Sequence, residues 1–236
     1  MIVHSAKPVD LAVGNGDQVV SGRRLLLALL LMLILSASIG TATWSIAHAI
    51  NPAWTATVDF VVLVVAEVYM SVLGALSIAF GGLKGLRERL GLHFTSGRDL
   101  WLAIGIDALC ALAAILTYGL LTPLFGAPIA TAVPVLKAAT DVTRLPGANL
   151  FTLLLIGVRV FLLVPLAEEL LFRGALYGWV RRYLRAIPTI LLTAVIFGFE
   201  HTYPGMPVPR LFFLVPLAFI FGIGVGWIRE RTGSTL

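Results

Sequence analysis

Long runs of apolar residues, separated by short polar segments, dominate the sequence of this 236-residue chain. A helix that crosses a bilayer needs about 20 largely apolar residues, because each helical residue advances about 1.5 Å through a hydrocarbon core about 30 Å thick. Stretches of this kind predict six membrane-spanning helices. Their expected bounds are 25–46, 56–82, 100–122, 150–180, 187–203 and 211–228.

Two of these stretches depart from a simple crossing. The stretch 150–180 is longer than a crossing requires and contains Pro165, which lacks a backbone N–H and should kink the helix. The stretch 187–203 is short. Gly81-Gly82 and Pro146-Gly147 are typical of turns between helices. The pattern therefore predicts an all-α, polytopic transmembrane helix bundle, without an internal repeat or a soluble domain.

Composition supports a chain that lies in a bilayer. Hydrophobic residues make up 59% of the sequence and charged residues 12%, and the mean hydropathy is +0.98. The first apolar stretch begins at Leu25 and exceeds the roughly 7–15 apolar residues of a secretory signal peptide, so we expect a retained helix. The single cysteine, Cys110, allows no intramolecular disulfide and is interpreted as a packing residue.

Lys and Arg residues are concentrated in alternate loops, as expected for cytoplasmic loops of membrane proteins. With a cytoplasmic N-terminus, the inner segments contain Lys7, Arg23, Arg24, Lys84, Arg87, Arg89, Arg98, Arg181, Arg182, Arg185, Arg229 and Arg231. The outer segments contain only Lys137, Arg144 and Arg210. This bias predicts a multi-pass membrane protein with a cytoplasmic N-terminus. The expected location is the plasma (inner) membrane of a bacterium. The net charge of +5 then reflects topology and contact with anionic lipids, not nucleic-acid binding.

The run Glu168-Glu169-Leu170-Leu171-Phe172-Arg173 places two carboxylates and a guanidinium inside a predicted span. Ionisable groups at that depth are costly and indicate a functional site. Glu169 and Arg173 are four residues apart, so an ion pair on one helix face is expected. Glu168 projects about 100° away from Glu169 and is free to act as a general acid or base.

A second polar position, Glu200-His201, closes the next apolar stretch. Counted from the inner end of each helix, Glu168 and His201 both lie about 20 Å along the helix, so they are expected at one level. Phe197 shares a face with His201, whereas Glu200 is expected to face another direction. We hypothesise that Glu168 takes a proton from a water held by His201, directly or through a metal, and that this water attacks a peptide carbonyl.

Other ionisable residues inside the predicted spans are interpreted as structural. These are Asp59, Glu67, Asp107 and Arg159. Arg159 is expected to form an ion pair with Asp107 or with Glu67. A polar network that only fastens helices together is also the structural alternative for the Glu168 cluster.

The motif Glu168-Glu169-x-x-x-Arg173, followed by Phe197-x-x-x-His201, resembles the first two signature motifs of a family of intramembrane proteases. This is the CAAX-processing and bacteriocin-processing family, also called the Abi or type II CAAX prenyl endopeptidase family. The resemblance covers roughly residues 95–236. It implies that Glu168 activates water, that Glu169 and Arg173 shape the site, and that His201 binds the water or a metal. Phe172 and Phe197 are expected to support the pocket.

The family continues from a Thr-Gly-Ser turn into another helix that carries a histidine and, four residues later, an asparagine or aspartate. Here the turn is Thr232-Gly233-Ser234 and the sequence ends at Leu236. We therefore expect one more helix beyond this point in the native chain; the alternative is a degenerate site. A catalytic zinc usually has three protein ligands, of which His201 and Glu168 are candidates. A divalent metal such as zinc and a metal-free glutamate mechanism both stay open.

The resemblance implies an intramembrane endopeptidase that acts on a membrane-associated peptide or protein, of CAAX type or bacteriocin-like. Its partners would be membrane lipids and this substrate. The expected organisation is a polar tail at 1–22, N-terminal transmembrane helices at 23–94 and a protease core at 95–236. Two other functions remain as alternatives. One is a non-catalytic membrane scaffold or immunity protein, and the other is a proton-coupled transporter, which the lack of an inverted repeat disfavours.

Overall fold

The computed structural model describes residues 20–53, 58–93, 96–125, 154, 156–202, 206 and 208–235. Every regular element within these residues is helical, so the predicted all-α bundle is confirmed. The long helices are α1 (Gly22–Ile50), α2 (Val58–Phe80), α4 (Gly97–Phe125), α10 (Ala186–Glu200) and α11 (Val208–Thr232), and α3 (Gly82–Leu90) is short. The helix α1 begins at Ser21, whose hydroxyl accepts a hydrogen bond of 3.3 Å from the Arg24 N–H.

Three described helices are long and apolar enough to cross a membrane. They are α1, the part of α2 from Leu63 to Phe80, and the part of α11 from Leu211 to Thr232. The other predicted crossings fall on α4, on the helical segment at 156–180 and on the 15-residue α10. The protein is thus a membrane protein by these helices, while the count of six crossings stays a prediction.

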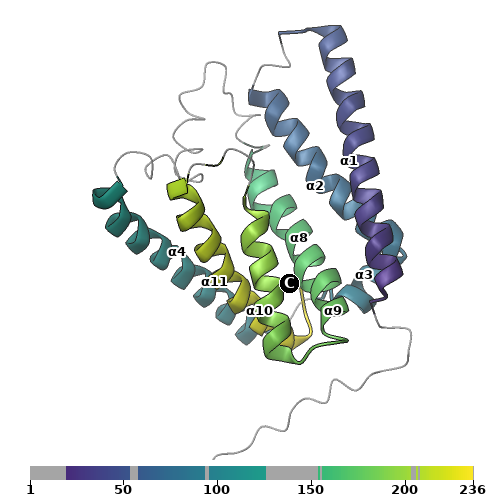
Figure 1. The fold of residues 1–236 in the computed structure, drawn as a ribbon. Helices are drawn as coiled ribbons and strands as arrows, with labels where there is room; N and C mark the ends of the chain where they lie inside the picture. The colour runs from purple at the N-terminus through teal and green to yellow at the C-terminus, as the bar shows by residue number, and fades with distance from the viewer. Residues whose placement is uncertain are drawn as a thin grey trace, which may run out of the picture.

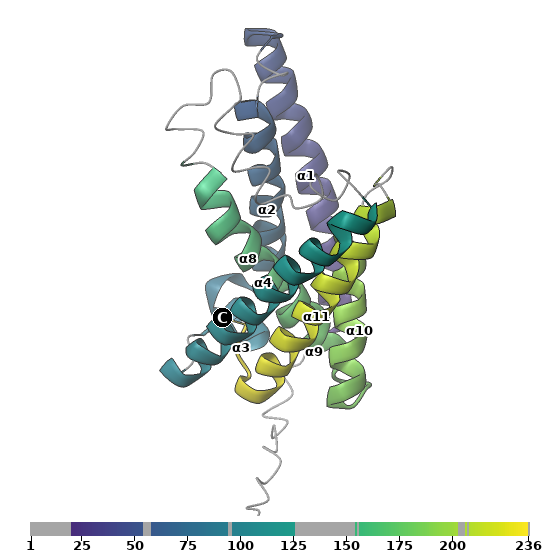
Figure 2. The same ribbon diagram turned by 90° about the vertical axis from the view of Figure 1, so that its left-hand side faces the viewer.

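The helices form two pairs with a helical rod between them. The pair α1 and α2 packs on one side, and α10 packs against α11, which also contacts α4 (Figure 1). One end of the bundle gathers the start of α1, the helix α3, the start of α10 and the end of α11, as both views show (Figure 2). The described basic residues that were assigned to the inner side lie near these helix ends, which agrees with a single inner face. Which side of the membrane this face occupies remains a prediction.

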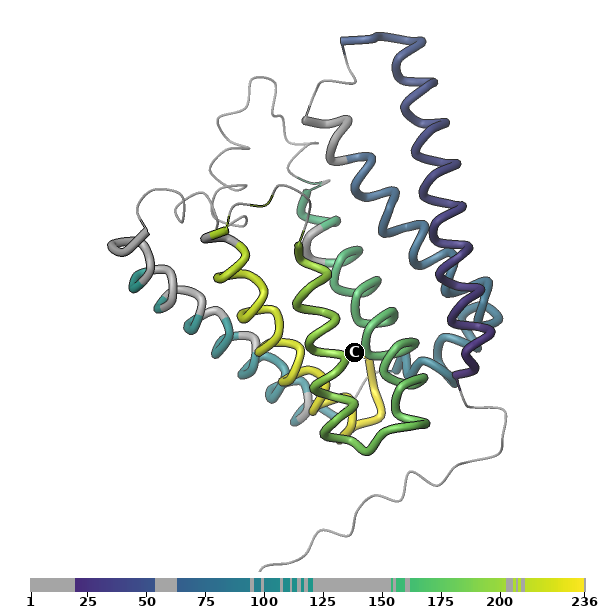
Figure 3. Tube along the Cα trace, viewed as in Figure 1, coloured from purple at the N-terminus to yellow at the C-terminus, as the bar shows by residue number. Residues whose placement is uncertain are grey.

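A continuous helical rod carries the first motif. Figure 3 shows residues 156–180 as one winding segment, composed of η2 (Arg159–Leu163), α8 (Val164–Glu168), η3 (Glu169–Leu176) and α9 (Tyr177–Val180). The segments η2 and η3 are π-helical, with wider i→i+5 turns. Pro165 lies between them, at the start of α8, where its missing N–H is accommodated. The backbone around Pro165 is thus irregular, with π-helical turns on both sides of α8, while the kink stays a prediction.

The hydrophobic pattern does not predict the short helix α3. Gly81 and Gly82 have φ angles of 89° and 73°, which glycine adopts without strain, so the predicted Gly81-Gly82 turn is present. The helix that follows buries Leu86 and Leu90 and exposes its charged side chains. It ends at Gly91, another left-handed residue with a φ angle of 76°. Its nine residues are part apolar and part charged, and they are too few to be predicted as a membrane-spanning helix.

An apolar core fills the region where α1, α2, α3 and the rod meet. Its buried members are Val20, Leu25, Ala28, Val72, Leu76, Ala79, Phe80, Leu86, Leu90, Ala167, Leu170 and Ala175. Several of these residues come from the rod, directly beside Glu168 and Glu169. The core therefore holds the rod in place against the N-terminal helices. It also determines which side of the rod faces away from those helices.

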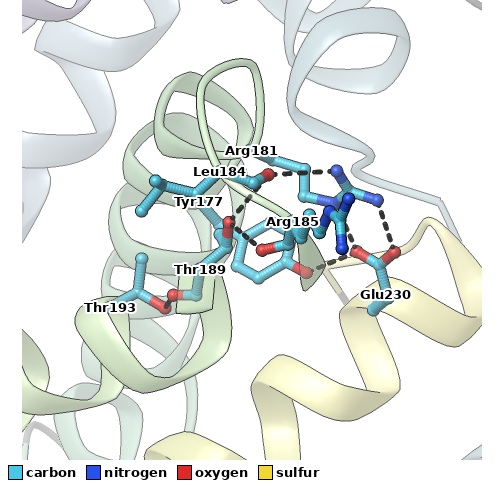
Figure 4. A network of polar contacts seen from close by, with 7 residues as sticks. All are labelled: Tyr177, Arg181, Leu184, Arg185, Thr189, Thr193 and Glu230. Carbon is cyan, nitrogen blue, oxygen red and sulfur yellow. Dashed lines mark hydrogen bonds and ion pairs between the residues drawn. The ribbon is translucent and has the colours of Figure 1, made fainter. Parts of the chain in front are cut away.

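A charged network fastens the end of α11 to the end of the rod. The Glu230 carboxylate accepts two hydrogen bonds of 3.1 Å from the Arg181 guanidinium and one of 2.5 Å from the Tyr177 hydroxyl (Figure 4). The hydrogen bonds to Glu230 raise the pKa of Arg181 above its usual value, so the arginine stays charged. Beyond α11, the Thr235 N–H donates to the Gly91 carbonyl at 2.9 Å. These contacts join the ends of α11, the rod and α3 at the predicted inner end of the bundle.

Close packing of α10 and α11 depends on small residues. A Cβ atom on Gly222 would lie 3.0 Å from Ala194, and one on Gly226 would lie 3.3 Å from Ile190. From the other side, a Cβ on Gly198 would lie 3.0 Å from the Val215 carbonyl oxygen. The missing side chains of Gly198, Gly222 and Gly226 thus allow the two helices to pack closely.

Replacing Gly222 by Ala should separate α10 from α11 slightly and destabilise the protein by about 1–3 kcal/mol, because the new methyl group overpacks the contact with Ala194. The matched control is Gly105→Ala on α4, where nothing lies within 4 Å of a new Cβ. Thermal unfolding in detergent should show a lower midpoint for Gly222→Ala alone. Equal midpoints for the two variants would contradict the close contact.

Replacing Glu230 by Gln should lower stability by about 1–2 kcal/mol, because Arg181 and Tyr177 lose a charged acceptor. The control is Glu88→Gln on α3, an exposed carboxylate outside this network. Chemical unfolding of both variants measures the difference. A Glu230→Gln protein as stable as the control would show that the network contributes nothing.

Candidate functional site

A cavity of about 300 Å³ lies between α2, the rod and the far end of α10. Its lining residues are Val65 and Tyr69 from α2, Arg159, Val164 and Glu168 from the rod, and Glu200 and His201 from the end of α10. Polar groups thus reach one space from three elements. The Glu200 side chain is 43% exposed, so the cavity can be reached from outside the bundle.

The end of α10 determines how His201 is held. The helix stops at Glu200, and His201 follows with φ −73° and ψ 5°, outside the helical region. The imidazole Nδ1 lies 2.9 Å from the Phe197 carbonyl oxygen and 3.3 Å from a Glu200 carboxylate oxygen. Both of these atoms are acceptors, so Nδ1 carries the hydrogen and donates it. Nε2 is then left with a free lone pair for a water or a cation.

The prediction that Glu200 faces another direction is wrong. Glu200 lines the same cavity as His201, and its carboxylate contacts the imidazole. The rule of 100° per residue holds only inside a helix. Because α10 ends here, successive side chains no longer diverge by that angle, and both turn to the cavity.

Three potential ligands converge in the cavity. Glu168, Glu200 and His201 each offer one ligand atom, and these atoms lie within 4.8 Å of one another. The structure therefore brings Glu168 and His201 together, at the common level that their positions along the two helices indicate. Two carboxylates and an imidazole match the type and number of protein ligands of a catalytic zinc. Glu200 is the third candidate ligand, which sequence reasoning missed.

Arg173 and Glu169 lie behind the cavity and do not line it. Arg173 is 3% exposed, and its Nε lies 3.5 Å from Glu169 Oε2, so the predicted ion pair is present. The guanidinium lies 4.1 Å from the centre of the Phe197 ring and 6.0 Å from that of Phe221. A cation over an aromatic face is stabilised by the ring quadrupole. The buried pair is therefore supported by the second motif's own phenylalanine.

Phe197 connects this ion pair to the imidazole. Its ring meets the His201 ring edge to face with centroids 4.7 Å apart, and it meets Phe172 in the same way at 5.1 Å. The Phe197 ring is buried, at 3% exposure. Arg173, Phe197 and His201 thus form a chain of contacts from the rod to the cavity. Through it, the ion pair fixes the position of the histidine.

Two further cavity residues carry no motif in the sequence. Tyr69 is one aromatic residue among many in an apolar stretch. Its hydroxyl is the only feature in the sequence that could indicate a functional residue. Arg159 was expected to pair with Asp107 or Glu67. Both Glu67 carboxylate oxygens are buried without a hydrogen-bond partner, so the pairing with Glu67 is absent. The side chains of Asp59 and Asp107 lie outside what the structure describes.

Replacing Arg173 by Met should destabilise the fold by about 3–5 kcal/mol, because Glu169 would remain among apolar side chains without its cation. Replacing Glu169 by Gln in the same protein removes the uncompensated charge and should recover much of this loss. Unfolding midpoints of the single and double variants measure the coupling. A double variant less stable than Arg173→Met would exclude this account of the pair.

Comparison with protein families gives one match, over residues 150–236, to the family model described as type II CAAX prenyl endopeptidase, Rce1-like. The matched region contains both motifs, from Glu168 to His201, and it excludes α1 to α4. The resemblance inferred from the motifs is thereby confirmed for the C-terminal part of the chain. No curated protein and no solved structure matches the chain.

Proposed function

Since residues 150–236 match a family of membrane proteases, we propose that this protein is an intramembrane endopeptidase that hydrolyses a peptide bond in a membrane-associated peptide or protein. The observation that carries the proposal is the convergence of Glu168, Glu200 and His201 within 4.8 Å in a cavity of the matched region. A half-buried carboxylate beside an imidazole with a free Nε2 is a pair that can activate water.

Glu168 and His201 orient the attacking water. The water donates one hydrogen to a Glu168 carboxylate oxygen and the other to His201 Nε2, so its lone pairs point at the substrate carbonyl. As the water oxygen bonds to the carbonyl carbon, Glu168 takes the proton. The carbonyl oxygen becomes an oxyanion.

Glu168 then returns the proton to the leaving nitrogen, and the carbon–nitrogen bond breaks. The products are a new carboxyl terminus and a new amine, and Glu168 regains its charge. Glu200 accepts from His201 Nδ1 and keeps the imidazole in the tautomer that this step requires. Glu169 and Arg173 act as positioning residues through Phe197.

A divalent metal such as zinc fits the donor set. Glu168, Glu200 and His201 Nε2 would hold it, and the hydrogen bond from Nδ1 to the Phe197 carbonyl is the outer contact that metal-binding histidines make. Such an ion would supply Lewis-acid activation of a bound water. With such an ion bound, Glu168, Glu200 and His201 would act as its ligands, and the proton transfer assigned to Glu168 above describes the site without the ion.

The family match suggests the substrate class, and the position of the cavity is compatible with it. The cavity lies about 20 Å along the helices from the predicted inner face, so a substrate must bring its peptide bond into the membrane. On the family match, CAAX-type and bacteriocin-like peptides are the proposed substrates.

Replacing Glu168 by Gln should lower kcat by about 10²–10⁴-fold, because glutamine keeps the shape of the side chain but cannot take the proton. Purified protein in nanodiscs would be incubated with a prenylated CAAX-type peptide and with an unprenylated apolar peptide, and products would be identified by mass spectrometry. Glu88→Gln on α3 is the control, since this exposed carboxylate lies on a different element.

Cleavage by the wild type and by Glu88→Gln, but not by Glu168→Gln, is the expected result. Undiminished cleavage by Glu168→Gln would refute the assigned base. Absence of cleavage of both peptides by the wild type would count against an endopeptidase of these substrate classes.

A further inference from the structure

Part of the cavity wall, formed by Val65 and Tyr69, comes from outside the region that matches the family. Val65 and Tyr69 are four residues apart on one face of α2, and both line the cavity. Arg159 of η2 lines it beside them, nine residues before Glu168. This wall presents a hydroxyl donor and a guanidinium, whereas the α10 side presents Glu200 and His201.

Neither donor on this wall has a protein acceptor among the described residues. Arg159 Nε is buried and has no hydrogen-bond partner. Tyr69 interacts electrostatically with Arg159, Glu168 and Glu200, but its hydroxyl makes no hydrogen bond to any part of the chain that the structure describes. Unsatisfied donors at membrane depth are costly unless a ligand oxygen completes them.

The direction of attack places the substrate oxygen near these donors. A cavity of about 300 Å³ is roughly 8 Å across if it is taken as a sphere, which is enough for one peptide unit and a water. The proposed water is held on the side of Glu168 and His201. A nucleophile approaches the carbonyl carbon at a slightly obtuse angle to the C=O bond, so the oxygen lies beside the water and tilts away from it. A substrate seated with this oxygen toward α2 places the developing oxyanion next to Tyr69 and Arg159.

We propose that the Tyr69 hydroxyl, with the Arg159 guanidinium beside it, donates to the carbonyl oxygen of the substrate and stabilises the oxyanion formed on it. This inference rests on the proposed endopeptidase function. Tyr69 is then a catalytic residue supplied by the N-terminal helices. Donors aimed at a developing oxyanion in a water-poor site are worth more than the same donors in water.

The donors also explain the charge balance of the cavity. Glu168 and Glu200 would otherwise disfavour a third negative charge nearby, and Arg159 is the cation in the cavity lining. The positive charge offsets this repulsion when the oxyanion forms. Arg159 belongs to the same rod as Glu168, so base and cation are held on one rigid element.

Tyr69→Phe tests the proposal, because it removes one oxygen atom and leaves the ring. It should lower kcat by about 10²–10³-fold with little change in KM. The matched control is Tyr183→Phe, an exposed tyrosine on the turn after α9.

Arg159→Gln should lower kcat, while Arg159→Lys should retain much more activity because it keeps the charge. Melting curves of all variants show whether each protein is folded.

Binding of a peptide phosphonate gives a second readout that does not require turnover. Its tetrahedral, anionic phosphorus group mimics the oxyanion, so Tyr69→Phe should weaken its binding by about the same factor as kcat/KM. Binding of the parent peptide, measured in the Glu168→Gln background, should be unchanged. Equal weakening of both ligands would overturn the inference, since it would indicate ordinary substrate binding or a structural role.

The failure of this inference differs from the failure of the proposed function. Cleavage by the wild type with an unchanged kcat in Tyr69→Phe would overturn the role of Tyr69 and leave the endopeptidase intact. A wild type that cleaves neither peptide and does not bind the phosphonate would overturn both.

Discussion

The buried guanidinium of Arg173 is the interaction on which the site depends. It is paired with Glu169 on the rod and stacked on Phe197 of α10, so one charge connects two helices. Breaking a buried ion pair leaves an uncompensated charge, which costs more than the pair itself contributes. The Phe197 ring also meets His201, so the helix position that places this ring on Arg173 also sets the position of the imidazole. Stability and the geometry of the site therefore share the same contacts.

Local departures from regular helix bring the polar groups into one cavity. The rod contains π-helical turns around Pro165, and Glu168 ends the short α-helical segment between them. The helix α10 ends at Glu200, which lets two successive side chains turn inward. Such irregular backbone is tolerated at membrane depth where it faces protein or a cavity. The close contact of α11 with α10, at Gly198 and Gly222, holds the latter half of α10 in place.

The helices and the site residues of the two motifs could be predicted from the sequence, because both depend on local patterns. Apolar runs predict the bundle, and the spacing of Glu169 and Arg173 predicts their ion pair. Glu200 is missed because the rule for its direction assumes a helix that continues. Tyr69 is missed because its partners lie far away in the chain, and α3 because nine mixed residues resemble a loop. Of the two partners predicted for Arg159, Glu67 is excluded and Asp107 lies outside the described side chains. A sequence shows which charges exist but not which ones meet.

The central claim is that water activated in this cavity attacks the peptide bond directly. A single-turnover reaction of the purified protein in H₂¹⁸O, followed by mass spectrometry of the product and of the protein, tests it. Direct attack predicts one ¹⁸O atom in the new carboxyl terminus of the first-turnover product and none in the Glu168 side chain. Label in Glu168 with unlabelled product would indicate a covalent intermediate instead and would contradict the claim.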